Sequence, residues 1–173
     1  MDETLLHAAE SKPVCPFDFR CGPYYVTLRP HLHEFLLACG EVFQLAVWSS
    51  SSADYLHAVL EQAISPDTTL EFVWSRQRCV QRFDPEWHRQ YFVKDLKKVK
   101  RRGYDLSRVL IVDDTPRKVE RNYGNAVYVR AFVGDPDDNE LPQLARYLRT
   151  LSELDDVRPV EKRGWQASVK ETG

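Results

Sequence analysis

Apolar residues along the chain alternate between short continuous runs and segments with helical spacing. The runs at 24–28, 42–48, 71–74, 109–112 and 126–129 predict strands, because they are short and rich in β-branched or aromatic residues. Helical spacing over 31–39, after Ser51 or Ser52, over 94–102 and over 139–154 predicts helices, and Thr115-Pro116 suits the start of another. This alternation predicts an α/β fold with a Rossmann-like, doubly wound and mainly parallel sheet.

Composition narrows the class of protein. The 173 residues, 43% of them hydrophobic, are enough for one domain with a substantial core. No apolar run approaches the roughly 20 residues that cross a bilayer, and residues 1–4 carry no basic-then-apolar signal region. We therefore expect an intracellular protein, cytoplasmic or nuclear, that does not enter a membrane.

Charge gives little support to a nucleic-acid role. The 24 Lys and Arg against 26 Asp and Glu leave a net charge of −2. The basic run at 97–102 is short, which favours a solvated helix face over a nucleic-acid site. We expect a monomer that does not bind nucleic acid.

The cysteines and the C-terminal stretch suggest no further chemistry. Cys15, Cys21, Cys39 and Cys79 form no C-x-x-C pair and have no zinc-type histidine spacing, so we expect reduced, mostly buried thiols, although their even number leaves disulfides open. The polar residues 158–173 predict a loose tail around Trp165, which leaves a domain over residues 1–157.

Polar residues stand where the predicted strands end. In an open parallel sheet, ligands bind beyond the carboxyl ends of the strands, so these positions are the candidates for chemistry. They are Ser49 after 42–48, Asp113 and Asp114 after 109–112, Lys94 at the start of the basic helix, and Asp2 and Thr4 at the start of the chain. Paired carboxylates with a hydroxyl and an ammonium suit Mg²⁺ and a phosphoryl group, so the set predicts phosphoryl transfer.

Each part of this set also has a plainer interpretation. Asp113 to Pro116 can form an Asx-turn that caps the next helix, and the serines at 49–52 can form a capped loop. Lys94 can be one more lysine of a solvated face. What favours a site is the order of these residues along the chain, each at its own strand end.

That order resembles the catalytic domain of the FCP/SCP-like, or NIF-type, phosphatases of the haloacid-dehalogenase (HAD) superfamily, which include phosphatases of the RNA polymerase II C-terminal domain. The matching stretches are residues 2–5, 28–36, 47–49 with Tyr55, 91–96, 109–116, 125–127 and 151–157. The resemblance implies a HAD-like sheet with a small β insertion, a Mg²⁺ cofactor and hydrolysis through a phosphoaspartyl intermediate.

The resemblance also implies roles for individual residues. Asp2 corresponds to the second Asp of the family's D-x-D-x-T motif, which protonates the leaving oxygen and then activates water. Asp114 would hold Mg²⁺ together with Asp2, and Asp113 would orient Lys94 or a metal-bound water. The implied catalytic residues are Asp2, Thr4, Ser49, Lys94 and Asp113, and Arg76 resembles a substrate-contacting arginine.

One departure from the family pattern concerns the nucleophile. The first Asp of the motif would lie two residues before Asp2, outside the sequence, together with most of the first, central strand. Either a longer form is a working phosphatase, or a short protein has lost catalysis. The first interpretation is favoured, because a missing central strand strips partners from both neighbours. We therefore predict that the 173-residue chain is inactive and poorly stable.

The resulting hypothesis is a Mg²⁺-dependent Ser/Thr phosphoprotein phosphatase. The arginines and aromatic residues within 65–91 could shape a phosphopeptide groove, although a plain surface hairpin would use the same residues. The alternative is a non-catalytic protein-binding module on the same fold. A two-component receiver domain fits less well, because receivers place the acidic pair early and the lysine last, whereas here Lys94 precedes Asp113.

Overall fold

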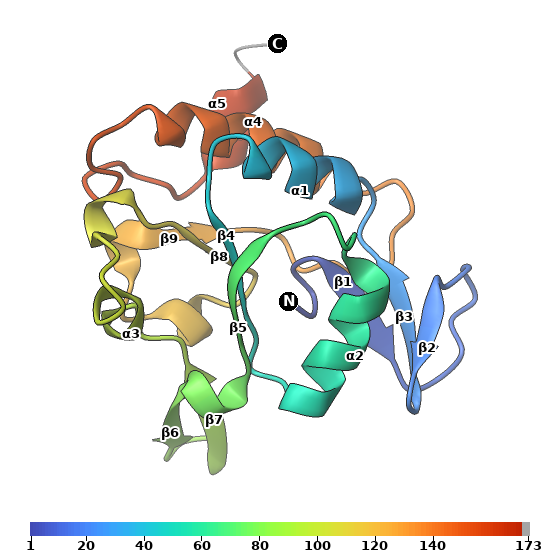
Figure 1. The fold of residues 1–173 in the computed structure, drawn as a ribbon. Coiled ribbons are helices and arrows are strands. Elements are labelled where there is room, and N and C mark those ends of the chain that lie inside the picture. The colour runs from blue at the N-terminus through green and yellow to red at the C-terminus, as the bar shows by residue number, and fades with distance from the viewer. Residues whose placement is uncertain (171–173) are drawn as a thin grey trace.

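Four small sheets form the framework of the molecule in the computed structural model, which describes residues 1–170 (Figure 1). The strands are β1 (Leu6–Ala9), β2 (Phe19–Cys21), β3 (Tyr24–Leu28), β4 (Leu45–Trp48), β5 (Leu70–Trp74), β6 (Val80–Asp84), β7 (Arg89–Val93), β8 (Ile111–Asp113) and β9 (Ala126–Tyr128). The pairs β4–β5 and β8–β9 are parallel, whereas the β1–β3–β2 sheet and the β6–β7 hairpin are antiparallel.

Helices cover the two parallel pairs. They are α1 (Leu32–Gly40), α2 (Ala53–Ala63), α3 (Lys97–Lys100), α4 (Glu140–Ser152) and α5 (Trp165–Lys170). One core cluster joins α1, α4 and α5 to β9, and another joins α2 to β1, β3 and β4. In Figure 1, α1, α4 and α5 lie together above the strands, and α2 lies below α1. The predicted α/β class with parallel strands is confirmed, and the β6–β7 hairpin supplies the predicted small β insertion.

A gap separates the two parallel pairs. No ladder joins β4 to β8, so each strand pairs on one edge only within the described sheets. A cavity of about 450 Å³, which we call the slot, is lined by residues of β4 and β8 and by side chains of α1 and α4. Ala46 of β4 is exposed, and Ile111 and Val112 of β8 are only half-buried. The spare edges and the mainly apolar lining match the space that one more parallel strand would fill.

The chain begins at the slot. Met1 is buried and lines the cavity together with Thr4 and Lys94. In Figure 1 the N-terminus lies near the centre of the view, whereas the C-terminus lies at the edge. Burial, followed by the nearby charge of Lys94, lowers the pKa of the Met1 amine from 8.0 to about 5.

Several elements are shorter than the sequence predicts. The helix predicted over 94–102 is reduced to α3, and the helix predicted after Thr115 is a short 3-10 helix, Pro116–Val119. The strand predicted over 109–112 runs over Ile111–Asp113, and β4 omits 42–44. Just before α3, the side-chain amide of Asn122 binds two backbone groups. Its oxygen accepts a hydrogen bond from Leu96 N, and its nitrogen donates one to the carbonyl of Lys94. Side-chain contacts here replace regular helix.

The prediction of a loose tail around Trp165 is wrong for the described residues. Trp165 is buried, starts α5, stacks on Tyr147 and donates a 2.7 Å hydrogen bond to the carbonyl of Tyr128. Lys162 is also buried, and its ammonium donates to the carbonyls of Gly124, Val157 and Val160. The polar composition of this stretch did not reveal that Trp165 and Lys162 attach it to the rest of the molecule. The last part of the predicted tail, 171–173, lies outside the described residues.

The cysteine prediction is confirmed. All four cysteines are free, and Cys21, Cys39 and Cys79 are buried while Cys15 is exposed. Burial raises the pKa of the Cys39 thiol to about 12 and also raises that of Cys79. These buried thiols are small apolar packing groups rather than nucleophiles.

Candidate active site

A tight turn in front of β1, residues 2–4, presents the first polar groups. The carbonyl of Met1 accepts hydrogen bonds from Thr4 N and Leu5 N, and Glu3 N donates to Leu6 O, with Glu3 at a φ of 61°. Because that backbone region is unfavourable for a residue with a Cβ, the surrounding contacts must hold the turn in place. We call this element the 2–4 turn.

The end of β8 carries a buried ion pair. Lys94 Nζ lies 2.6 Å from Asp113 Oδ2, and both side chains are almost fully buried. The other carboxylate oxygen of Asp113 accepts a hydrogen bond from Thr115 N. Lys94 directly follows β7, and its backbone N–H donates to the carbonyl of Lys118 at 2.7 Å. The lysine therefore extends from one strand end to the next instead of lying on a solvated face.

Asp114 joins the 2–4 turn to this strand end. Its Oδ1 accepts a 2.7 Å hydrogen bond from the Thr4 hydroxyl, and its Oδ2 accepts one of the same length from the Thr115 hydroxyl. Burial acts to raise the pKa of Asp114, but the hydrogen bonds from Thr115 and Thr4 and the charge of Lys118 outweigh it and lower that pKa. Asp114 is thus held as an oriented carboxylate, the form that a cation requires.

Asp2 is held by a tyrosine of α2. Tyr55 OH donates a 2.8 Å hydrogen bond to Asp2 Oδ1. Burial, and then the charge of Asp2, raise the pKa of Tyr55, so the tyrosine stays a donor at neutral pH. Tyr55 is positioned by the start of α2, where Ser52 Oγ accepts a hydrogen bond from Tyr55 N.

Ser49 lies at the end of β4 and is buried. Its N–H donates 2.8 Å to the carbonyl of Trp74 at the end of β5, and its hydroxyl lies 2.7 Å from the hydroxyl of Ser51. The next residue, Ser50, lines a cavity of about 200 Å³ together with Thr115, the residue after Asp114. Ser49 and Asp114 are therefore both adjacent in sequence to the walls of one small cavity.

Arg76 lies beside that cavity on an exposed turn after β5. Its Nε donates 2.7 Å to the carbonyl of Ser50, and its guanidinium lies 4.9 Å from the ring centre of Phe92. Arg117 is placed similarly over Tyr91, 3.9 Å from the ring centre, and is paired with Asp84. Two aromatic rings of β7 are thus each covered by an arginine next to the cavity.

The structure brings the predicted residues together as linked pairs rather than as one contiguous cluster. Within residues 1–170, the hydrogen bonds join Thr4 to Asp114 and Lys94 to Asp113, while Asp2 and Ser49 bond to Tyr55 and Ser51. The first two pairs are connected through the adjacent positions Asp113 and Asp114, and Asp2 is joined to them through the 2–4 turn. Ser49 and Ser51 form a separate pair. Sequence reasoning used Tyr55 only as part of a family match and assigned it no role, because nothing in helical spacing shows which side chain a tyrosine will meet.

The carboxylate oxygens of the site suit a hard cation that prefers oxygen ligands. Among the described residues no group of three or more His, Cys, Asp or Glu side chains is placed to enclose a metal. Mg²⁺ needs no such cage, since it is usually held by one or two carboxylates, waters and substrate phosphate. Asp114 and Asp2 offer oxygen atoms of this kind, and an all-oxygen set does not suit zinc.

Comparison with known proteins matches most of the chain to one family. A family model described as "NLI interacting factor-like phosphatase" matches residues 1–158. The human "Carboxy-terminal domain RNA polymerase II polypeptide A small phosphatase 1" is 34% identical over 168 residues, which cover 92% of this chain and 60% of the relative. "Phosphatase Herzog" of Drosophila melanogaster is 30% identical over 92% of this chain and 45% of its own length. The chain thus spans about half the length of these relatives.

A solved structure shares the fold. The structure titled "The Structure of Fcp1, an essential RNA polymerase II CTD phosphatase" superposes with a TM-score of 0.59 at 14% identity, over 99% of this chain and 60% of that one. None of the helices in residues 1–170 is long and apolar enough to cross a membrane. From the matched residues and the shared HAD-like fold, the chain belongs to the NLI interacting factor-like family of protein phosphatases.

Proposed function

We propose that the protein is a Mg²⁺-dependent phosphatase of Ser/Thr phosphoproteins that works through a phosphoaspartyl intermediate. The observation that carries the proposal is the buried Lys94–Asp113 pair beside Asp114, whose carboxylate is oriented by the hydroxyl of Thr4. The ammonium of Lys94, the carboxylate of Asp114 and the hydroxyl of Thr4 are each held in one orientation. Such groups can provide the positioning and charge neutralisation on which phosphoryl transfer depends. We also expect an intracellular setting, because all four thiols are free.

Each side chain has a part in this proposal. Asp114 would hold Mg²⁺ through its carboxylate and Asp2 through its backbone carbonyl, so that the Asp2 carboxyl group stays free to carry a proton. When bound, Mg²⁺ would supply positive charge to the phosphoryl oxygens. Lys94, kept in place by Asp113, would donate to a phosphoryl oxygen and steady the acyl phosphate. The Ser49 hydroxyl would donate to another oxygen. Asp2 would give a proton to the leaving serine or threonine oxygen and then take one from the attacking water.

The attacking carboxylate would stand directly before Met1. In a D-x-D-x-T motif that contains Asp2 and Thr4, the first Asp is the residue bonded to the Met1 amine. That amine is buried, and after burial the charges of Lys94, Asp2, Asp113 and Lys118 act on its pKa. A carboxylate oxygen at this position would form the bond to phosphorus while the bond from phosphorus to the leaving oxygen breaks. An apolar strand before it would lie in the slot.

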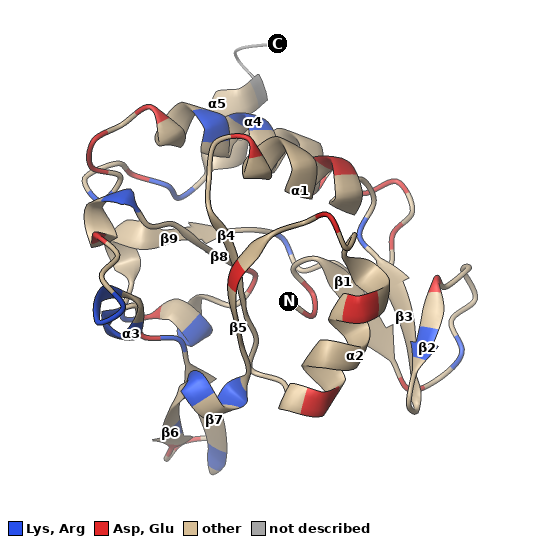
Figure 2. Ribbon diagram, in the orientation of Figure 1, with Lys and Arg blue, Asp and Glu red and all other residues tan. Residues whose placement is uncertain are grey.

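A phosphopeptide suits the surface next to this edge. The cavity beside Ser50 is bordered by the rings of Tyr91 and Phe92 and by Arg117 and Lys118. Figure 2 shows Lys and Arg on α3 and on the short segment between β5 and the β6–β7 hairpin, and β7 itself carries Arg89. Arginines bind phosphate oxygens well, and aromatic rings pack against peptide side chains. We propose that Arg76 is one of these substrate-contacting arginines.

The test compares the 173-residue chain with a version extended in front of Met1. The extension carries an apolar strand of about five residues that ends in Asp. We expect the extended protein to hydrolyse a phosphoserine peptide with Mg²⁺ and to stop when EDTA is added. The 173-residue chain, and a matched extension that ends in Asn, should release no phosphate. Equal turnover by the chain without the extension would contradict the proposal.

The same experiment separates an enzyme from a binding module. If the Asp extension raises the melting temperature and the protein binds the phosphopeptide but releases no phosphate, the non-catalytic interpretation holds. If replacing Asp114 by Ala in the extended protein leaves hydrolysis unchanged, the assignment of the cation site is wrong.

A further inference from the structure

One buried arginine fastens the 2–4 turn to a distant loop. Arg29 follows β3, and its side chain is 0% exposed. Its Nε donates to Asp138 Oδ1 and its Nη2 donates to Asp138 Oδ2, both at 2.8 Å. The two residues, 109 positions apart, thus form a bidentate pair. A guanidinium held in this way has its remaining N–H groups fixed in direction.

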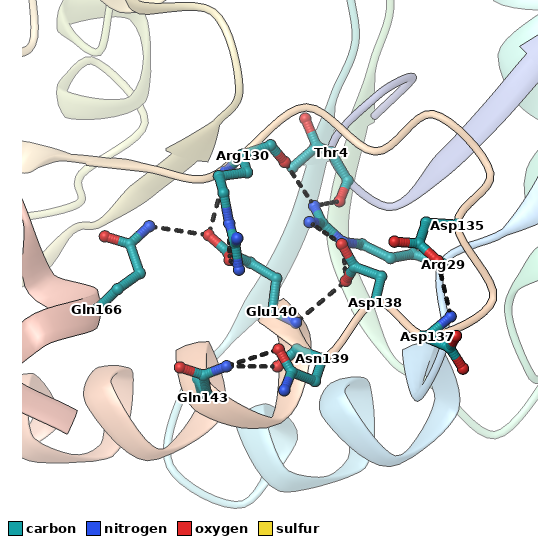
Figure 3. A network of polar contacts seen from close by, with 10 residues as sticks. All are labelled: Thr4, Arg29, Arg130, Asp135, Asp137, Asp138, Asn139, Glu140, Gln143 and Gln166. Carbon is teal, nitrogen blue, oxygen red and sulfur yellow. Dashed lines mark hydrogen bonds and ion pairs between the residues drawn. The ribbon is translucent and has the colours of Figure 1, made fainter. Parts of the chain in front are cut away.

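Those remaining groups point at backbone carbonyls. Arg29 Nη1 donates to Thr4 O and to Arg130 O, both at 2.9 Å. Figure 3 shows the guanidinium between the turn that carries Thr4 and the chain at Arg130, with Asp138 on its other side. The ring of Phe132 packs against the same guanidinium, 5.5 Å from ring centre to Cζ. One side chain therefore spans the 2–4 turn and the segment before α4.

Two backbone bonds complete this attachment. Phe132 N donates 2.7 Å to Glu3 O, and Arg29 N donates 2.9 Å to Leu5 O. The carbonyls of three successive residues, Glu3, Thr4 and Leu5, are thus all bound from outside the turn. This explains how Glu3 keeps its unfavourable positive φ.

Thr4 connects this attachment to the cation site. Its carbonyl accepts from Arg29, and its hydroxyl donates to Asp114. We propose that Arg29, locked by Asp138, is a positioning residue that keeps the Thr4 hydroxyl on Asp114 and so holds that carboxylate in the geometry that binds Mg²⁺. Arg29 touches neither the cation nor the phosphoryl group. The inference rests on the proposed function, because it assigns Asp114 to the cation.

A neighbouring ion pair offers a matched control. Arg130 bonds through Nε to Glu140, a fully buried carboxylate that also accepts from Gln166. Figure 3 places this pair in the same network, on the side away from the 2–4 turn. Removing the Arg130 side chain disturbs the network but leaves the bonds of Arg29 to Thr4 and Asp138 in place. A purely structural role for Arg29 would make the two arginines equivalent.

The test uses Arg29→Lys, Asp138→Asn and Arg130→Gln in the 173-residue chain. Arg29→Lys keeps the positive charge but cannot form the bidentate pair with Asp138. Asp138→Asn keeps the shape of the side chain but removes the negative charge that holds Arg29. Mg²⁺ affinity is measured by calorimetry, and thermal stability is measured alongside. We expect Arg29→Lys and Asp138→Asn to weaken Mg²⁺ binding about 10–100-fold, the usual effect of disturbing the groups that orient a metal ligand. Arg130→Gln should lose stability and keep its affinity.

Equal affinity in Arg29→Lys and the unmodified chain, with stability lost as in Arg130→Gln, would overturn the proposal. Thr4→Val supplies a second variant, since it keeps the shape of the turn and removes only the hydroxyl. It should bind Mg²⁺ as weakly as Arg29→Lys without a comparable loss of stability. If it binds as well as the unmodified chain, Thr4 is not the link.

A readout without metal separates this inference from the proposed function. The side-chain rotamer of Thr4 can be followed through its methyl scalar couplings by NMR. We expect one rotamer in the unmodified chain and in Arg130→Gln, and averaging between rotamers in Arg29→Lys. If no form of the protein binds Mg²⁺, the proposed function fails, and an unchanged Thr4 rotamer in Arg29→Lys would independently reject the positioning role.

Discussion

The polar edge of the sheet and the slot lie side by side but differ in how completely they are filled. By the polar edge we mean the 2–4 turn, Lys94, Asp113 and Asp114. There the carboxylates of Asp2, Asp113 and Asp114 each have a donor, and the ion pair is buried. In the slot, by contrast, β4 and β8 each have an unpaired edge within the described sheets, and the Met1 amine is buried with a lowered pKa.

This difference shows that the two parts depend on different segments of the chain. The polar edge is held in place partly by side chains that come from outside the sheet, such as Tyr55 and Arg29. The slot can be filled only by backbone, because strand edges need N–H and C=O partners. The polar edge can therefore be largely assembled while the slot is unfilled.

Filling the slot should have the largest effect on stability. An apolar strand in front of Met1 that buries two large side chains would add about 3–6 kcal/mol to the free energy of unfolding, at about 1.5–3 kcal/mol each. Urea denaturation of the chain with the Asn-ended extension, compared with the 173-residue chain, measures this gain. An extension of the same length made of Gly and Ser is the control, and an equal gain from it would show that the slot does not take a strand.

At the polar edge, breaking the buried pair should be nearly as costly. Lys94→Met leaves the Asp113 carboxylate buried without its cation, which costs about 3–5 kcal/mol. The double variant Lys94→Met/Asp113→Leu removes both charges and should recover most of that loss. The denaturation midpoints of the single and the double variant, compared with that of the unmodified chain, measure the loss and its recovery. A single variant as stable as the unmodified chain would mean that the pair is not desolvated.

The amine at the end of the slot should make stability depend on pH. Because its pKa is lowered from 8.0 to about 5, the folded chain binds fewer protons than the unfolded chain between these values. Stability should therefore rise from pH 5 to pH 8, by up to about 4 kcal/mol at about 1.4 kcal/mol per unit. Comparison with an Nα-acetylated chain isolates this group, since acetylation removes the charge. Parallel pH profiles for both forms would show that the amine is not buried in solution.

The smallest effect is expected at Tyr55. Tyr55→Phe removes the donor to Asp2 and should cost about 1 kcal/mol of stability. Because burial and the charge of Asp2 raise the pKa of Tyr55, the hydroxyl contributes stability below the ordinary tyrosine pKa and loses it as the pH rises above that value. Thermal melts at neutral pH and at pH 11 test the sign. Tyr25→Phe, at a partly exposed tyrosine that packs against Phe17, is a suitable control.

Sequence patterns predicted the fold better where packing alone decides the structure. The run at 24–28 became β3 residue for residue, and the apolar stripe at 139–154 became α4, with Leu141, Leu144, Leu148 and Leu151 buried. The predictions failed where side chains cap or bind backbone, as with Asn122 beside the short α3. They also missed β1 and β2, which are too short to show alternation.

The candidate site was predictable only in part. The residues after the strands identify the polar edge, because parallel strands bring their carboxyl ends to one side. The contact of Tyr55 with Asp2 joins residues 53 positions apart, and that of Arg29 with Asp138 joins residues 109 apart. No periodicity encodes such contacts, since they depend on how separate elements pack. Only the three-dimensional structure shows them.

The most direct test of the central claim is to identify the phosphorylated residue. The protein with the Asp-ended extension is mixed with a ³²P-labelled phosphopeptide and Mg²⁺ and quenched in acid after a few milliseconds. We predict a hydroxylamine-sensitive acyl phosphate on the Asp before Met1, and no label in the Asn-ended protein. A hydroxylamine-resistant phosphate on Ser49 or Thr4, or hydrolysis without any trapped label in a protein that shows a burst, would contradict it.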